Sequence, residues 1–195
     1  MLHRFYPIVP GADWVARIVP LGVKTVQLRV KGAGLDRVRA EIARSLAICA
    51  THGCQLIVND YWCEAIDLGA EFVHLGQEDL GQADLPAIRK AGIKLGISTH
   101  TPEELQIALE AGPDHVALGP IYETTLKAMQ YPPQGLDRIG EWKALIACPL
   151  VAIGGITLER APAVFRAGAD SIAVVTDIVG NPRPEQRVAD WLAAS

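Results

Sequence analysis

The chain has 195 residues, of which 50% are hydrophobic and 21% are charged, and its 18 basic and 22 acidic side chains give a net charge of −4. This size and composition predict one globular domain, residues 1–195, and the acidic excess argues against binding to nucleic acid or to anionic membranes. No apolar stretch reaches the ~18 residues of a membrane span. The first ten residues lack the apolar core of a signal peptide, so a cytoplasmic location is expected.

Short β-branched runs alternate along the chain with longer segments of helical period. Strands are expected at Phe5–Val9, Thr25–Arg29, Gln55–Val58, Phe72–Leu75, Lys94–Ile97, His115–Leu118, Leu150–Ile153 and Ser171–Val175. Helices are expected near Asp13–Pro20, Leu35–His52, Tyr61–Leu68, Leu85–Ala91, Pro102–Glu110, Leu136–Ile146, Leu158–Arg166 and Glu185–Ala193. Glycines follow most of these helices, as expected where a left-handed residue ends a helix.

Eight such units without a long insertion predict the α/β class and a single (β/α)₈ TIM barrel. The main alternative is a doubly wound open sheet, which usually carries a glycine-rich loop after its first strand. Here the first strand leads into Pro10-Gly11-Ala12-Asp13, which is no such loop. The one long connection, from Tyr122 to Gln134, follows the sixth strand, and a loop of that length in a compact domain is usually functional.

In a barrel of this kind, functional residues follow the carboxyl ends of the strands. Gln27, Arg29 and Lys31 are two residues apart, so an extended strand would place them on one face, where an anion would offset their cost. Internal ion pairs with Asp60 or Glu78 are the alternative explanation.

Two aspartates and two glycine-containing turns complete the set of strand ends. Asp60 and Asp79 follow neighbouring strands, and carboxylates near a polyphosphate suit Mg²⁺, although helix capping also explains many aspartates. Gly154-Gly155 and Val175-Thr176 follow the last two strands, where barrels commonly bind phosphate through backbone N–H groups; a simple tight turn is the alternative. The strand ends therefore predict two anion sites, one of them metal-assisted, and small-molecule phosphorylated substrates.

The strand-end motifs, taken in order, resemble those of a known family. They read VQLRVK at 26–31, VNDYW at 58–62, VHLGQEDL at 73–80, GISTH at 96–100, LGPIY at 118–122, PQGL at 133–136, VAIGGI at 151–156 and IAVV at 172–175. Together they cover nearly the whole chain, which resembles the thiamine-phosphate synthase family. The resemblance implies a Mg²⁺-dependent transferase that joins 4-amino-2-methyl-5-hydroxymethylpyrimidine diphosphate to thiazole phosphate and releases pyrophosphate, in thiamine biosynthesis.

The resemblance also assigns site residues. It implies diphosphate contacts at Gln27, Leu28, Arg29, Val30, Lys31, Asn59 and Lys127, and metal ligands at Asp60 and Asp79. It implies a pyrimidine contact at Ser98 and thiazole-phosphate contacts at Thr124, Gly155, Val175 and Thr176. Thr125 and Leu126 belong to the same substrate-binding loop as Thr124. Arg29, Lys31 and Lys127 are the implied catalytic residues, because they neutralise the departing diphosphate. No general base is needed. The oligomeric state is open, with a homodimer as one expectation.

A few positions depart from the family pattern. Gly32 stands where aspartate is usual, Glu123 replaces a proline, Leu126 replaces a hydroxyl residue, and Thr176 replaces a serine while keeping its hydroxyl. Two alternatives therefore stay open: a thiazole tautomerase-like isomerase, and a non-catalytic paralogue that binds thiamine phosphate. The tautomerase relatives tend to lose the diphosphate and metal residues that this chain keeps, and they tend to carry histidine where it has Pro120.

Overall fold

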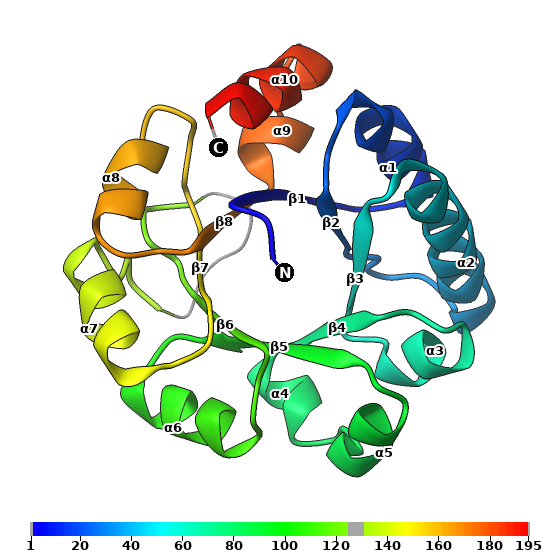
Figure 1. The fold of residues 1–195 in the computed structure, drawn as a ribbon, viewed down its shortest axis with the longest axis horizontal. Coiled ribbons are helices and arrows are strands. Elements are labelled where there is room, and N and C mark those ends of the chain that lie inside the picture. Colours follow the sequence, from blue (N-terminus) through cyan, green and yellow to red (C-terminus); the bar gives the residue numbers. More distant parts are fainter. Residues whose placement is uncertain (1, 125–130, 195) are drawn as a thin grey trace.

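The computed structural model describes residues 2–124 and 131–194. Eight parallel strands close into a barrel in which each strand pairs with its neighbours in sequence and β1 pairs with β8, as Figure 1 shows in a view down the barrel. The strands are β1 (Phe5–Val9), β2 (Thr25–Leu28), β3 (Gln55–Asn59), β4 (Phe72–Leu75), β5 (Lys94–Thr99), β6 (His115–Leu118), β7 (Leu150–Ile153) and β8 (Ser171–Val174). The predicted (β/α)₈ barrel is confirmed.

Helices form the outer layer around the strands (Figure 1). They are α1 (Ala12–Ile18), followed by the short 3₁₀ turn η1 (Val19–Leu21), α2 (Leu35–His52), α3 (Trp62–Asp67), α4 (Gln77–Leu80), α5 (Leu85–Lys90), α6 (Pro102–Glu110), α7 (Asp137–Leu145), α8 (Ala161–Arg166), α9 (Thr176–Val179) and α10 (Pro184–Ala194). The eight predicted helices are present with ends shifted by up to three residues. The sequence missed α4 and α9, because four residues are too few to show a helical period.

The apolar core has two parts, one on each side of the strands. Inside the barrel, a cluster gathers alternate strand residues such as Tyr6, Ile57, Phe72 and Val151, while the larger cluster fills the space between strands and helices. This division follows from the period of two along a strand, which sends successive side chains to opposite faces. The barrel interior also holds buried polar side chains, among them Gln27, Asn59, His74 and His115.

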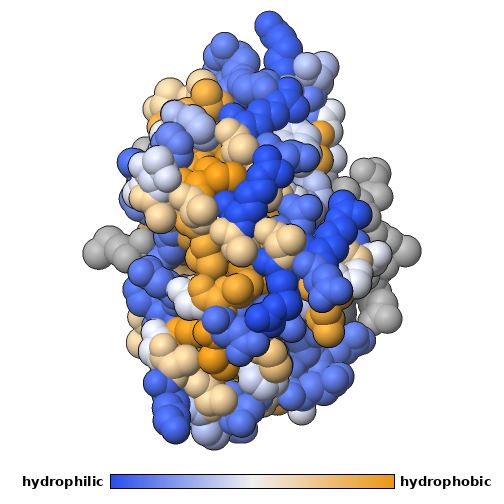
Figure 2. Space-filling view, turned by 90° about the vertical axis from the view of Figure 1, so that its right-hand side faces the viewer, coloured by the Kyte–Doolittle hydropathy of each residue, from blue (hydrophilic) through white to orange (hydrophobic). Residues whose placement is uncertain are grey.

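The outer surface carries an apolar band on one side. Figure 2 looks at the side that α1, α2 and α3 cover in Figure 1 and shows apolar residues running between charged ones. Exposed alanines of α2 at positions 40, 43, 47 and 50 recur at helical spacing. Across residues 2–124 and 131–194, no helix combines the length and the apolar character that crossing a membrane requires.

Candidate active site

The end of β3 carries a strained turn that presents Asp60. Asp60 has φ = 69°, and it is the one non-glycine residue with positive φ in the described part of the chain. Aspartate tolerates this left-handed conformation better than most residues, yet it still costs energy. The turn is held by a backbone hydrogen bond from Asp60 N to His74 O (2.9 Å) and by one from Trp62 N to Asp60 O (2.9 Å). Such strain at a carboxylate is typical of a functional position.

Asp60 and Asp79 form a carboxylate pair between β3 and α4. Burial and the nearby negative charge of Asp60 raise the pKa of Asp79, while Lys31 opposes that rise. Lys31 forms an ion pair with Asp60, whose side chain is 16% exposed. The pair therefore lies where an added cation would be favourable. Part of the alternative explanation from the sequence, an ion pair between this lysine and Asp60, is also observed.

The donor set suits a metal that keeps other ligands. Within residues 2–124 and 131–194, no cluster of three or more His, Cys, Asp or Glu side chains could hold a metal on its own. Mg²⁺ typically takes one or two carboxylates and completes its shell with substrate oxygens and water. Asp60 and Asp79 fit that pattern, since they supply hard oxygen atoms beside the basic residues at the end of β2.

The predicted diphosphate residues divide by burial. Gln27 and Asn59 are buried inside the barrel, and Asn59 Nδ2 has no hydrogen-bond partner in the structure. Arg29 and Lys31 follow the end of β2 and are exposed, whereas Gln27 lies within β2. The prediction that these three residues share one face of a strand is therefore wrong for Arg29 and Lys31. Leu28 and Val30 are buried, and only their backbones could meet a ligand. An unpaired buried amide is costly unless a ligand satisfies it.

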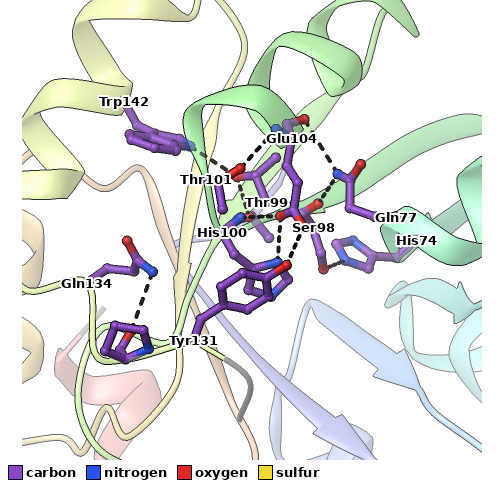
Figure 3. A network of polar contacts seen from close by, with 12 residues as sticks. His74, Gln77, Ser98, Thr99, His100, Thr101, Glu104, Tyr131, Gln134 and Trp142 are labelled. Atoms are coloured by element: carbon purple, nitrogen blue, oxygen red, sulfur yellow. Dashed lines mark hydrogen bonds and ion pairs between the residues drawn. The ribbon is translucent and has the colours of Figure 1, made fainter.

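Ser98 lies in β5 within a polar network that Figure 3 shows. Its hydroxyl lies 2.8 Å from His74 Nε2, and its carbonyl accepts a hydrogen bond of 2.6 Å from Gln77 Nε2. His74 is buried between Ser98 and His115, within hydrogen-bond distance of both. His115 had no usable signal in the sequence.

A second part of this network holds Tyr131, which lies in the chain between β6 and α7. In Figure 3, Tyr131 lies flat against His100, with ring centroids 4.5 Å apart, and both point toward Glu104 of α6. Tyr131 Oη donates to Glu104 Oε1 (2.9 Å), and the backbone N–H of His100 donates to Glu104 Oε2 (2.7 Å). Glu104 therefore ties this loop to the end of β5.

The two buried histidines make stability depend on pH. Burial lowers the pKa of His74 from 6.5 to about 4, and burial with the neighbouring ring lowers the pKa of His115. The unfolded chain therefore binds more protons between pH 6.5 and 4, so the free energy of unfolding is largest above this range and falls as the pH drops through it. For His74 alone the loss is on the order of 3 kcal/mol.

Urea unfolding at a series of pH values would measure this effect. In the His74→Gln variant the free energy of unfolding should lose part of its dependence on pH between 6.5 and 4. An equally steep dependence in the variant would show that His74 titrates normally in the folded protein.

The turns after β7 and β8 lie where the sequence predicts the phosphate site. Gly154 and Gly155 have φ of 98° and 62°, which favours glycine. A Cβ at Gly155 would strike the carbonyl oxygen of Glu123 and would lie 2.9 Å from Tyr122 Cβ. Gly155 therefore allows the loop after β6 to approach the turn after β7. Val175 precedes α9, whose first residue, Thr176, is exposed.

Asp177 links the two turns of this phosphate site. Its Oδ2 accepts hydrogen bonds from Leu158 N (3.3 Å), Arg187 Nε (2.8 Å) and Trp191 Nε1 (2.8 Å). The carboxylate thus joins the segment after β7 to α9 and α10. The sequence reasoning missed it, because its partners lie 10 to 19 residues away and no local motif marks them.

Replacing Asp177 by alanine should therefore raise the KM for the monophosphate substrate about tenfold, because the two turns lose their common anchor. The KM for the diphosphate substrate should stay unchanged. Asp170→Ala is a matched control, since Asp170 similarly joins Lys143 to Leu150 N (2.6 and 2.7 Å) just before β8. Equal KM changes in both variants would contradict the prediction.

Of the remaining predicted residues, Thr124 is half-buried after β6. Thr125, Leu126 and Lys127 lie outside the described residues. The structure thus brings Gln27, Asn59, Asp60 and Asp79 to the ends of adjacent strands β2 to β4, and it brings Gly155, Val175 and Thr176 to the ends of β7 and β8.

Comparison with known proteins shows the family to which the chain belongs. A family model described as thiamine monophosphate synthase matches residues 6–178. The thiamine-phosphate synthase of Rhizobium etli is 60% identical over 195 residues, which cover 100% of this chain and 96% of that relative. The thiamine-phosphate synthase of Neisseria meningitidis is 49% identical over 191 residues, which cover 97% of this chain and 93% of that relative. A thiamine phosphate pyrophosphorylase structure from Pyrococcus furiosus shares the fold with a TM-score of 0.87 at 23% identity, covering 98% of this chain and 94% of that one. The chain belongs to the thiamine monophosphate synthase family.

Proposed function

We propose that the protein is a thiamine-phosphate synthase, a transferase of thiamine biosynthesis. It joins 4-amino-2-methyl-5-hydroxymethylpyrimidine diphosphate to thiazole phosphate and releases pyrophosphate. Family membership and 60% identity over the whole chain support this activity. The observation that supports it most is the placement of two sets of residues at the ends of the strands: carboxylates and bases around β2 to β4, and glycine turns after β7 and β8.

The first step is loss of pyrophosphate from the pyrimidine methylene carbon. The aminopyrimidine ring is electron-rich and stabilises the cation that remains, so the protein has to stabilise the leaving group. Asp60 and Asp79 are the residues that would hold Mg²⁺, which when bound supplies positive charge to the pyrophosphate. Arg29 and Lys31 add positive charge at the end of β2, and the unpaired Asn59 Nδ2 can donate a hydrogen bond. Lys127 is proposed for the same task from the family resemblance.

In the second step the thiazole nitrogen attacks the pyrimidine cation. The glycine turn at Gly155 and the N–H groups near Val175 and Thr176 would bind the thiazole phosphate and place that nitrogen near the carbon. Ser98 would contact the pyrimidine from β5. No side chain needs to remove a proton for the carbon–nitrogen bond to form.

The isomerase alternative is disfavoured by the residues that the barrel keeps. Arg29, Lys31, Asn59, Asp60 and Asp79 are all present at the ends of β2 to β4, where a tautomerase needs neither a diphosphate site nor a metal. A non-catalytic paralogue would have no use for the Asp60–Asp79 pair.

One assay distinguishes these functions. With both substrates and Mg²⁺, wild-type protein should form thiamine phosphate and pyrophosphate in equal amounts. Tight binding of thiamine phosphate without turnover would contradict the synthase and favour the binding paralogue. Isomerisation of the thiazole in the absence of the pyrimidine diphosphate would favour the tautomerase.

A cytoplasmic location and a homodimer remain predictions. Sedimentation of the purified protein would test the dimer, and fractionation of cells would test the location.

A further inference from the structure

Three side chains form a polar line inside the barrel that ends at Ser98. His115 Nε2 lies 3.2 Å from His74 Nδ1, and His74 Nε2 lies 2.8 Å from Ser98 Oγ. His115 is 0% exposed, and its other ring nitrogen, Nδ1, is buried without a hydrogen-bond partner. The polar contact of His115 is therefore directed to His74, and through it to Ser98.

The barrel register explains how two histidines from different strands meet. His74 of β4 pairs with Gly96 of β5, and Gly96 pairs with His115 of β6, so the three residues lie at one level around the barrel. A Cβ at Gly96 would overlap the His115 ring and would lie 2.7 Å from His74 Nδ1. The absence of a side chain on the middle strand leaves the space in which the rings stack, with centroids 5.3 Å apart.

A line of neutral imidazoles constrains hydrogen positions. Each neutral ring donates through one nitrogen and accepts through the other. The bond between His74 Nδ1 and His115 Nε2 needs one hydrogen, so both rings must carry their hydrogen on the same type of nitrogen, either Nε2 in both or Nδ1 in both. The ring nitrogen of His74 that carries the hydrogen then decides whether Ser98 Oγ accepts a hydrogen bond from the ring or donates one to it. If Ser98 donates to the ring, its oxygen can only accept a hydrogen bond from a ligand; if it accepts from the ring, its own hydrogen remains free to be donated to a ligand.

We propose that His115 and His74 are positioning residues that orient the Ser98 hydroxyl toward the pyrimidine substrate, and that their shared tautomer decides whether this hydroxyl can donate a hydrogen bond to it. This inference rests on the proposed function for the identity of the ligand, and it adds two residues that act through Ser98. Ser98 is the group that touches the substrate. The histidines lie behind it, and they limit which face of an aminopyrimidine, donor or acceptor, Ser98 can satisfy.

The tautomers can be measured without substrate. Nitrogen-15 NMR of the free protein at pH 7.5 should show both buried rings neutral and in the same tautomeric form, assigned with the His74→Gln and His115→Gln variants. Opposite tautomers would place two hydrogens or none between the facing nitrogens and would overturn the proposal. A charged ring would overturn it as well, because such a ring has no acceptor nitrogen. This measurement is independent of whether the protein is a synthase.

Kinetics test the action through Ser98. His115→Leu should lower kcat about tenfold, the scale of one lost hydrogen bond, and should leave the KM of the thiazole phosphate unchanged. His115→Gln, which keeps a polar group opposite His74, should recover part of that loss. The exposed His52, at the end of α2, provides the control variant His52→Gln, which should match wild type.

A double-mutant cycle separates positioning from a general structural effect. In a Ser98→Ala background, His115→Leu should cause no further loss of kcat, because the group on which it acts is gone. A full tenfold loss in that background would mean that His115 acts by packing alone and would overturn the proposal. If wild-type protein instead showed no synthase turnover, the proposed function would fail while the NMR result would still stand.

Discussion

Asp60→Asn is expected to lower kcat/KM for thiamine phosphate formation by roughly 100-fold, because it removes one of two carboxylates that would hold the metal. Asparagine has nearly the same size and, like aspartate, tolerates a positive φ, so the turn at φ = 69° should persist. The substitution also removes the charge that pairs with Lys31. The loss should appear as a higher Mg²⁺ requirement, which a titration of activity against free Mg²⁺ would measure.

The control for this variant is Asp67→Asn on α3. Asp67 forms an exposed ion pair with Arg39 at 2.9 Å, so its replacement removes a comparable charge away from the strand ends. Its activity and Mg²⁺ response should equal those of wild type. Removing divalent metal with a chelator should abolish turnover by wild-type protein, and restoring Mg²⁺ should recover it. Turnover that survives chelation, or an unchanged Mg²⁺ response in Asp60→Asn, would contradict the predicted metal site.

Gly155→Ala is expected to reduce kcat/KM by roughly 100-fold, chiefly through a higher KM for the thiazole phosphate. The new Cβ would strike the carbonyl oxygen of Glu123 and would crowd Tyr122, so the turn after β7 would have to move away from the loop after β6. A shift of about 1 Å in a binding group is enough for an effect of this size. Steady-state kinetics with each substrate varied in turn would show which KM rises.

The matched control separates the collision from backbone strain. Gly69 has φ = 71°, close to the 62° of Gly155, but a Cβ there would meet nothing within 4 Å. Gly69→Ala should therefore cost about 1–2 kcal/mol in stability from the left-handed conformation, with normal kinetics. If both variants lost activity equally, strain would account for the effect and the proposed role of Gly155 would be wrong.

Most of the barrel could be predicted from the sequence because its signals are local. Each strand is a short β-branched run, and each helix has its own period, in most cases with a glycine after its end, so the eight units could be recognised one at a time. The predicted ends of β2 and β8 each ran one residue too far, at Arg29 and Val175. Pairing depends on the neighbouring strand, which a local pattern does not record.

The part of the candidate site that could be predicted consists of residues that come directly after a strand. Asn59, Asp60 and Asp79 could be proposed because a parallel barrel brings all carboxyl ends of its strands to one face. The strain at Asp60 could not be predicted, and its pairing with Lys31, 29 residues away, could be named only as one alternative, because both depend on how β2 and β3 lie together.

By itself, the sequence determined the order of elements and the closed barrel, and it gave the chain positions at which phosphate and metal residues are proposed, because each of these follows from local pattern and motif. Only the tertiary structure decided which side chains support them. Asp177 binds Arg187 and Leu158, and His115 reaches Ser98 through His74 across the gap left by Gly96. These contacts join residues 10 to 41 positions apart. They exist because barrel closure and strand register bring the residues to the same level, and no local pattern specifies that geometry.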